Sequence, residues 1–179
     1  MFDTLQRLLE FHGPQSKAIV WAHNTHVGDA RATDMADDGM FNIGELARDV
    51  FGDAAFLVGF GSYQGTVIAG KKWGAAMKKI KMPPAEYGSW EYFLHQAGGN
   101  DKLLIMKHLE KSIALQKHID HRAIGVVYNP EFEKYGNYVP SLVASRYDAF
   151  LHIDQTTALH PLNIQPDGSQ VPETYPFGV

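Results

Sequence analysis

Short apolar runs alternate with amphipathic stretches along the chain of 179 residues. The apolar runs are too short for helices and are bounded by glycine, proline or polar residues, which is typical of buried strands. Strands that alternate with helices favour a sheet whose strands run in one direction. We therefore expect an α/β fold, a largely parallel sheet of about four strands with helices on its faces, with strands at residues 18–22, 54–60, 123–128 and 149–153.

The expected helices are marked by apolar residues at helical spacing and by residues that cap helix ends. Asp3 is the expected N-cap of a first helix, which Gly13-Pro14 ends, and Asn42 is the expected N-cap of a helix that runs to Val50. A long polar loop is expected between them, at residues 24–41. Further helices are expected at residues 89–95, from Asn100 or Asp101 to residue 113, and at residues 138–145.

The domain organisation follows from composition. Residues 1–162 show one composition regime, and we expect them to form a single α/β domain. Proline recurs in residues 163–179, at Pro166, Pro172 and Pro176. Since proline fixes its own backbone angle and lacks an N–H donor, this stretch is expected to be an irregular tail.

Charge and composition exclude several classes of protein. A net charge of −4 gives no electrostatic footprint for nucleic acid or for an anionic membrane. The absence of cysteine excludes disulfides and thiolate metal sites. No apolar run approaches the roughly 20 residues that span a bilayer, and the acidic N-terminus is unlike a signal peptide. We expect a soluble cytoplasmic protein with no nucleic-acid or membrane partner.

Polar residues follow each expected strand. In a parallel sheet, functional residues gather beyond the carboxyl ends of the strands. If all the strands are parallel, these polar clusters converge at one rim of the sheet and form the candidate site. The clusters are residues 23–26, 61–64, 128–129 and 154–156.

His23 and His26, in the stretch WAHNTH, are the first candidates for chemistry. Imidazole titrates near neutral pH and can take a proton from water and return it. In a tight turn or the first turn of a helix, both side chains could face the same space. Two other interpretations remain open at this point. One histidine could simply cap a strand end, or both could bind a metal ion together with Asp29 or Asp34.

Other motifs give weaker signals. The glycines of GFGSYQG match neither phosphate-binding pattern, and Gly-x-Ser-x-Gly is absent, so a tight turn is favoured there. Glu91 lies beside aromatic residues, where burial would raise its pKa, but a capping or surface glutamate is the favoured interpretation. His95 could pair with Glu91 if the segment is helical. His118 and His121 are expected in a solvated loop. Arg122 and Arg146 could bind a carboxylate or fix the sheet edge.

The chain contains, in order, the blocks WAHNTHVGDARATDM, NIGELAR, LVGFGSYQGTVIA, GSWEYFLH and the stretch from Arg122 to Leu162. This order resembles the erythromycin esterase family, which includes macrolide-inactivating esterases and many members of unknown substrate. The resemblance extends from about Thr4 to Leu162. The combination of blocks is far more specific than any one of them.

The resemblance implies hydrolysis of a macrolactone-like carboxylic ester by a histidine-activated water, without a cofactor and with a link to antibiotic response. The family's His-Asn-x-His element matches His23, Asn24 and His26. His23 and His26 are therefore the expected catalytic residues, and Asn24 is expected to bind the substrate. The other expected substrate-binding residues match recurrent family positions and are Gly61, Ser62, Glu91 and His95.

The sequence also departs from the family pattern. Complete members are longer and carry an upstream Gly-Glu-x-x-His-Gly element that contributes another histidine and a glutamate, and this chain has no such element. It resembles the C-terminal part of a larger α/β fold. One alternative is therefore a non-catalytic fragment or ligand-binding module, and another is a metal-dependent hydrolase. Besides a small ester, the expected partner is the missing upstream segment or a second copy of the chain.

Overall fold

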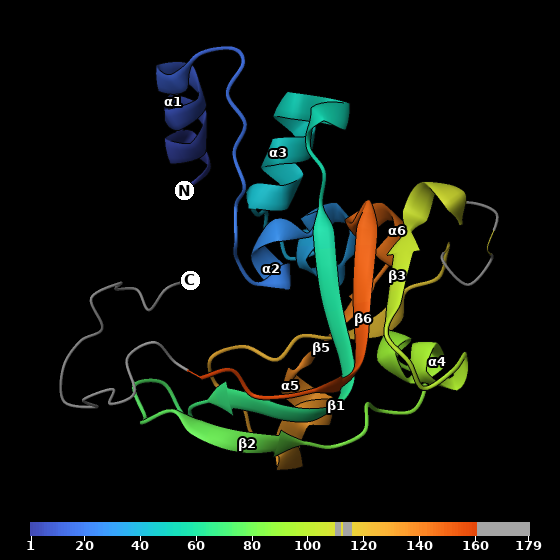
Figure 1. The fold of residues 1–179 in the computed structure, drawn as a ribbon. Helices are drawn as coiled ribbons and strands as arrows, with labels where there is room; N and C mark the ends of the chain where they lie inside the picture. The colour runs from blue at the N-terminus through green and yellow to red at the C-terminus, as the bar shows by residue number, and fades with distance from the viewer. Residues whose placement is uncertain (110–111, 113–115, 161–179) are drawn as a thin grey trace.

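The computed structural model describes residues 1–109, 112 and 116–160. Within them, four strands form a mixed sheet in the order β2-β1-β6-β3 (Figure 1). The strands are β1 (Val58–Ala69), β2 (Lys78–Met82), β3 (Lys102–Ile105) and β6 (Ala149–Thr156). The expected α/β class and the sheet of four strands are confirmed. The expected Pro-rich tail at residues 163–179 lies outside the described residues.

The expectation of a largely parallel sheet is wrong. Only β1 and β6 are parallel, with Gly61 beside His152 and Gln64 beside Gln155. The strand β2 follows β1 after a short connection and returns alongside it, and β3 is antiparallel to β6. A short connection leaves no room for the crossover that parallel neighbours require. The polar clusters consequently do not meet at one rim. Residues 61–64 lie within β1, and residues 154–156 lie within β6. The backbone N–H of Tyr128, in contrast, donates to the carbonyl oxygen of Gly70, just beyond the end of β1.

Two expected strands are absent from the described structure. Residues 18–22 form no strand, and the side chains of Ile19 and Trp21 are 94% and 86% exposed. Residues 123–128 contribute one isolated bridge, and the strand in this region, β4 (Ile119–Arg122), lies just before them. A continuous apolar run identifies a buried strand only when a neighbouring strand is available to pair with it. The edge of β1 at Phe60 is occupied instead by the side chain of Asn24.

The helices are short, and several were expected. Asn42 caps α3 (Ile43–Phe51), and Ser89 caps α4 (Trp90–Gln96), as the capping signals predicted. The first helix, α1 (Phe2–His12), begins before Asp3, so Asp3 is not its N-cap. The expected loop at residues 24–41 contains α2 (Asn24–Val27) and the 3-10 turns η1 (Ala30–Ala32) and η2 (Asp34–Ala36). A further turn, η3 (Gly52–Ala54), follows α3.

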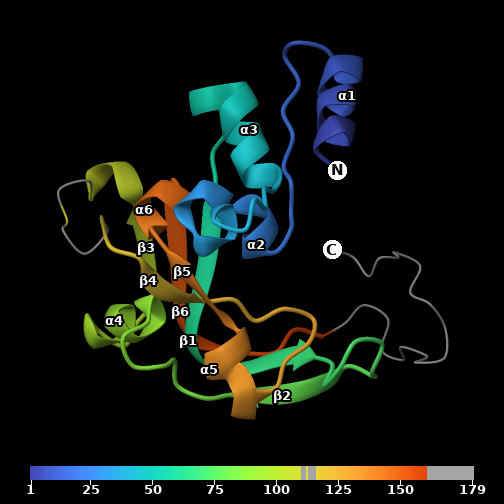
Figure 2. The ribbon, with the colours of Figure 1, turned by 180° about the vertical axis from the view of Figure 1, so that it is seen from behind.

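The C-terminal half differs most from the expected elements. The helix expected after Asn100 is instead the strand β3, followed by the turn η4 (Met106–His108). The helix expected at residues 138–145 is divided into β5 (Tyr138–Ser141) and α6 (Val143–Arg146). Before them lie η6 (Pro130–Phe132) and α5 (Glu133–Gly136). β4 and β5 form a separate antiparallel pair, on the same side of the main sheet as α4 (Figure 2).

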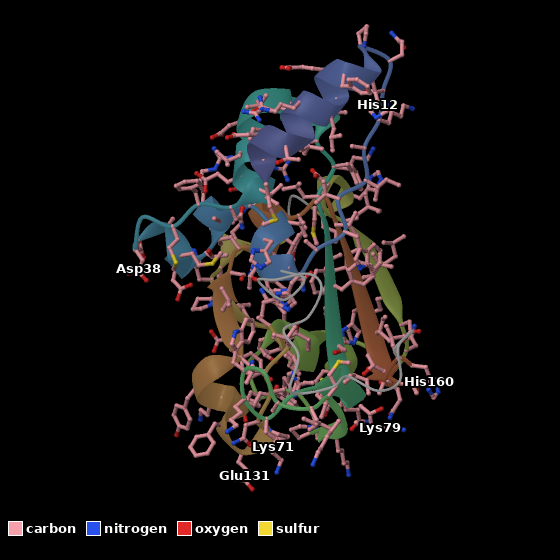
Figure 3. All side chains as sticks on the ribbon, turned by 90° about the vertical axis from the view of Figure 1, so that its left-hand side faces the viewer. His12, Asp38, Lys71, Lys79, Glu131 and His160 are labelled. Atoms are coloured by element: carbon pink, nitrogen blue, oxygen red, sulfur yellow. The ribbon has the colours of Figure 1, made fainter. Side chains whose placement is uncertain are left out.

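The main core lies between the sheet and this second layer. Its buried side chains come from α4, α6, β6 and the connecting segments: Leu57, Trp90, Met106, Val143, Tyr147 and Phe150. A second apolar cluster joins Ala69 and Met82 of the β1–β2 pair to Tyr128. Charged side chains such as Asp38, Lys71, Lys79 and Glu131 extend outward from the molecule (Figure 3). No helix in the described ranges is long and apolar enough to cross a bilayer.

Candidate functional site

The stretch WAHNTH forms a tight turn at the start of α2. His23 is the N-cap residue, and its Nδ1 accepts the backbone N–H of Thr25 at 3.3 Å. Its Nε2–H donates to the carbonyl oxygen of Ile124 at 2.9 Å. Both ring nitrogens of His23 are therefore engaged by the protein. These two bonds also fix the tautomer, because Nδ1 must accept while Nε2 donates.

The environment of His23 favours the neutral imidazole. Burial lowers its pKa below the ordinary value of 6.5, against the opposing effect of the Ile124 carbonyl. The positive charge of Arg146, and any proton taken up by His26 or His121, lowers the pKa of His23 further. His23 is consequently uncharged at neutral pH. Its position resembles that of a capping group more than that of a freely accessible base.

His26 lies on the next turn of the chain in a different environment. Its backbone N–H donates to the carbonyl oxygen of His23 at 2.8 Å, which brings the two residues together. Its half-buried side chain makes no hydrogen bond with any residue that the structure describes. The imidazole of His26 is therefore free to bind water or a ligand.

Asn24 connects this turn to the sheet. Its Oδ1 accepts the N–H of Phe60 at 3.1 Å, and its Nδ2–H donates to the carbonyl oxygen of Phe60 at 2.5 Å. These are the bonds that a neighbouring strand would make. Nδ2 of Asn24 also lies 3.3 Å from Nε2 of His121. Asn24, expected to bind the substrate, thus has a structural function in the free protein.

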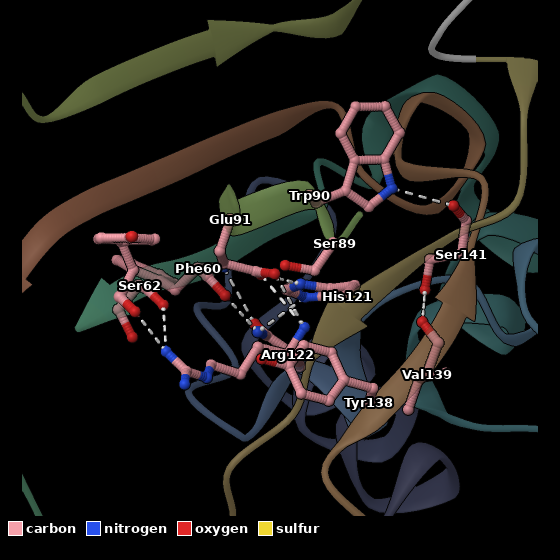
Figure 4. Close-up of polar contacts among 12 residues, drawn as sticks. Phe60, Ser62, Ser89, Trp90, Glu91, His121, Arg122, Tyr138, Val139 and Ser141 are labelled. Atoms are coloured by element: carbon pink, nitrogen blue, oxygen red, sulfur yellow. Dashed lines mark hydrogen bonds and ion pairs between the residues drawn. The ribbon is translucent and has the colours of Figure 1, made fainter. Parts of the chain in front are cut away.

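Glu91 and His121 form a fully buried pair between α4 and β4 (Figure 4). The Nδ1–H of His121 donates to Oε1 of Glu91 at 2.6 Å, and the N–H of Arg122 donates to both carboxylate oxygens. Burial alone would raise the pKa of Glu91. The charge and hydrogen bond of His121, with the backbone N–H donors, outweigh that effect and hold the pKa below its usual range. The favoured interpretation of Glu91 as a capping or surface residue is wrong because its side chain is fully buried, and the raised pKa considered for a buried Glu91 is not found either.

The expected pairing of Glu91 with His95 is also wrong. His95, one turn later on α4, instead places Nδ1 2.7 Å from Oδ1 of Asp154 in β6. Its ring stacks on Tyr63 of β1, with the ring centres 3.7 Å apart. The carboxylate of Asp154 lies also 3.4 Å from Nε2 of the buried His152. A second histidine–carboxylate cluster therefore lies farther along the same face of the sheet.

Gly61 and Ser62 take different positions within β1. A side chain on Gly61 would lie 2.6 Å from the ring of Phe150 and 2.8 Å from Oε1 of Glu91. Glycine is required there because it leaves the space in which the Glu91–His121 pair lies. The hydroxyl of Ser62 points to the sulfur of Met82, at 3.8 Å. Gly61 thus contacts the candidate site, while the Ser62 hydroxyl faces the second apolar cluster.

The two arginines considered in the sequence are both buried. Nε of Arg122 donates to the carboxylate of Glu133, and its terminal nitrogens donate to the carbonyl oxygens of Ser62, Tyr63 and Pro83. Arg146 donates to Ser141 Oγ at 2.6 Å and lies beside the ring of Tyr147. Both residues join elements around the site and present no guanidinium to a substrate.

The metal-binding alternative gains no support from the described residues. Asp29 is engaged by Arg31 at 2.7 Å and by Arg48 at 3.5 Å. In the described part of the chain, no group of three or more His, Asp or Glu side chains is arranged to hold a metal ion.

The sequence interpretation did not identify His121, His152, Asp154 or Tyr63 as individual site residues. His121 was expected in a solvated loop, yet it is fully buried. An alternation signal was available in β4, where His121 and Ile119 lie on one face of the strand. Glu91 pairs with His121 and Asp154 pairs with His95 across distant segments, so no local signal predicts these pairs.

We expect the free energy of unfolding to fall as the pH is lowered from 7.5 to 5.5. Burial lowers the pKa of both His23 and His152. The unfolded chain takes up these protons as the pH falls through about 6.5, while the folded protein resists them. The stabilisation is fully present above that pH and is lost as the pH falls toward the folded-state values. Urea denaturation at the two pH values measures the loss.

The variants His23→Asn and His152→Gln should each reduce this pH dependence. Asparagine at residue 23 retains an N-cap acceptor, so the comparison keeps the start of α2 intact. The control is His12→Gln, at an exposed histidine in α1. An unchanged pH dependence in both variants would contradict the assignment.

Comparison with known proteins agrees with this architecture. The family model described as Erythromycin esterase matches residues 1–156. A crystal structure described as a succinoglycan biosynthesis protein is similar at a TM-score of 0.64 and 18% identity, over 83% of this chain and 35% of that chain. A crystal structure of a protein from Bacillus cereus is similar at a TM-score of 0.61 and 16% identity, over 78% and 33% of the two chains.

At these identities the solved structures show a shared fold, and this chain spans about a third of the length of each. The family match is more informative, because it covers nearly all of the described residues and includes both His23 and His26. The chain belongs to the erythromycin esterase family.

Proposed function

We propose that this chain contributes to an esterase-type hydrolase site in which a histidine activates water against a carboxylic ester. Family membership supports the hydrolase class. The observation that carries the proposal is the α2 turn, where His23 is fixed and neutral while the adjacent His26 keeps an imidazole without a hydrogen-bond partner among the described residues. A general base needs a ring nitrogen that can reach the proton of water, and the imidazole of His26 has no protein hydrogen bond in the described chain that would compete for it.

The proposed reaction uses His26 as the base. A ring nitrogen of His26 takes a proton from water while the water oxygen bonds to the ester carbonyl carbon. The bond from that carbon to the alcohol oxygen then breaks, and His26 returns the proton to the departing alcohol. The products are a carboxylic acid and an alcohol. His23 and Asn24 act as positioning residues, because their hydrogen bonds fix the turn that carries His26.

Apolar surface beside the turn supports an ester with a sizeable organic group. The rings of Trp21 and Phe60 lie 5.9 Å apart, and both are exposed. Asn24 holds the backbone of Phe60, so this aromatic pair adjoins the α2 turn. A macrolactone and a role in the response to antibiotics are the finer proposal, and they rest on family membership alone.

The test measures hydrolysis of p-nitrophenyl esters, and ring opening of a macrolactone by mass spectrometry. We expect His26→Ala to lower kcat/KM about 10²–10⁴-fold, the usual contribution of a general base. His23→Ala should cause a smaller loss and weaken α2. His12→Ala, at a remote exposed histidine, is the matched control and should match the wild type. Unchanged kcat/KM in both α2 variants would overturn the proposal.

The alternative function is a ligand-binding module without catalysis. It is favoured by the engagement of both ring nitrogens of His23, which leaves that imidazole no free nitrogen for proton transfer. Macrolactone binding measured by calorimetry, together with no hydrolysis above the uncatalysed rate, would establish this alternative in place of the esterase.

A further inference from the structure

The second histidine cluster has the arrangement of a catalytic dyad. Asp154 Oδ1 accepts a hydrogen bond, so Nδ1 of His95 must carry the proton in that 2.7 Å contact. In the neutral ring, Nε2 then holds the lone pair. Among the described residues, none makes a hydrogen bond to Nε2 of His95, and the side chain of His95 is 28% exposed. The basic nitrogen is therefore accessible from solvent.

Tyr63 packs against the His95 ring, and backbone hydrogen bonds hold the end of α4 that carries it. Tyr63 stacks on it with an angle of 6° between the ring planes. The backbone N–H of Gly98 donates to the carbonyl oxygen of His95 at 2.9 Å, and Nζ of Lys102 donates to the carbonyl oxygens of Gly98 and Asn100, which holds this turn closed. A base that is already oriented loses little freedom when it reacts.

The carboxylate of Asp154 is also held in place. The backbone N–H of Asp154 donates to Oδ1 of Asp101 at 2.9 Å. Nε2 of the buried His152 lies 3.4 Å from Oδ1 of Asp154. The hydrogen bonds and charges of the two histidines keep the pKa of Asp154 below its ordinary value, although burial acts in the opposite direction. Asp154 is therefore an anion at neutral pH and can stabilise positive charge on His95.

We propose that His95 and Asp154 form a proton-transfer dyad, in which Nε2 of His95 is a general base toward the water that attacks a bound ester. His95 would take one proton from water as the oxygen bonds to the carbonyl carbon, and would return it to the alcohol oxygen as the ester bond breaks. The dyad shares no residue and no secondary-structure element with the site of His23 and His26 at α2. It differs from the Glu91–His121 pair in accessibility, because that pair is fully buried.

Reactivity toward diethyl pyrocarbonate tests the dyad without relying on ester turnover. The reagent modifies the free nitrogen of an imidazole, and peptide mass spectrometry resolves the rate at each histidine. We expect His95 to react faster than the exposed His12, which lies at the end of α1 (Figure 3). Asp154→Asn should slow the reaction at His95 about tenfold, because removing an oriented carboxylate weakens the base. The rate at His12 should stay constant.

The matched control is Asp120→Asn, which removes the charge of an exposed aspartate in β4 that the proposal does not use. Equal rates at His95 in Asp120→Asn and Asp154→Asn would overturn the proposal, as would a His95 no faster than His12. Hydrolysis of p-nitrophenyl acetate by His95→Gln gives a second readout, where we expect a loss of about tenfold or more. A reactive His95 in a chain whose α2 variants keep full activity would support the dyad and reject the proposed role of His26.

Discussion

Replacing Glu91 with alanine should lower the free energy of unfolding by about 3–5 kcal/mol, the usual cost of removing one partner from a buried ion pair. The carboxylate is fully buried and accepts hydrogen bonds from Nδ1 of His121 and from the backbone N–H of Arg122. Alanine would leave both donors buried without an acceptor. It would also open a cavity beneath Gly61, where Glu91 now fills the space.

Two comparisons separate these effects. Glu91→Gln retains the shape and one acceptor oxygen but not the charge, and it should lose part of the stability. Glu86→Ala removes an exposed glutamate from the preceding loop and should stay within about 0.5 kcal/mol of the wild type. Urea denaturation followed by circular dichroism measures all three. A Glu91→Ala protein within about 1 kcal/mol of the wild type would show that the pair contributes little.

Local signals predicted the elements that depend on local chemistry. Asn42 and Ser89 cap helices because a short polar side chain satisfies a free N–H of the first turn wherever the helix lies. The strand expected at residues 149–153 is the first part of β6, where Ala149 and Phe150 are buried. These features need no knowledge of the rest of the chain.

Strand direction and pairing depend on distant residues, and here the sequence interpretation was wrong. An apolar run such as residues 18–22 indicates an apolar segment, but it does not indicate whether a neighbouring strand is present to pair with it. Val139 and Pro140 of β5 were expected within a helix, because no local signal shows that β4 is available as a partner. The direction of β3 and β2 is likewise set by their connections to the sheet.

The side chains of the candidate site likewise take partners from distant parts of the chain. The histidine pair in WAHNTH was recognisable, but only the structure shows that His23 is held by the carbonyl of Ile124, 101 residues away. Glu91 was expected to bind His95 because helical spacing is a local rule. Each of the two residues finds a closer partner on another element, His121 for Glu91 and Asp154 for His95. Spacing identified the participants, and tertiary packing selected the pairs.

Gly65→Ala should cost a similar amount of stability, about 3–5 kcal/mol, through two effects at one position. Gly65 has a φ of +135°, a conformation that residues with a side chain rarely adopt. A methyl group there would lie 2.1 Å from the carbonyl oxygen and 2.7 Å from the backbone nitrogen of Thr156. Since both atoms are backbone, no rotation of a side chain relieves the contact. The strands β1 and β6 would have to separate at this point.

The matched control is Gly74→Ala, which has a φ of +74° and no atom within 4 Å of the added methyl group. It carries the backbone strain without the contact, and should cost about 1–2 kcal/mol. The difference between the two variants measures the close approach of β1 and β6. Separation of these strands would also part Tyr63 and Asp154, which hold the His95 ring from β1 and β6. We therefore expect Gly65→Ala, but not Gly74→Ala, to slow the reaction of His95 with diethyl pyrocarbonate. Equal stability of the two variants would show that a small shift of the chain relieves the contact at Thr156. An equal reaction rate at His95 in the two variants would show that the dyad tolerates this shift.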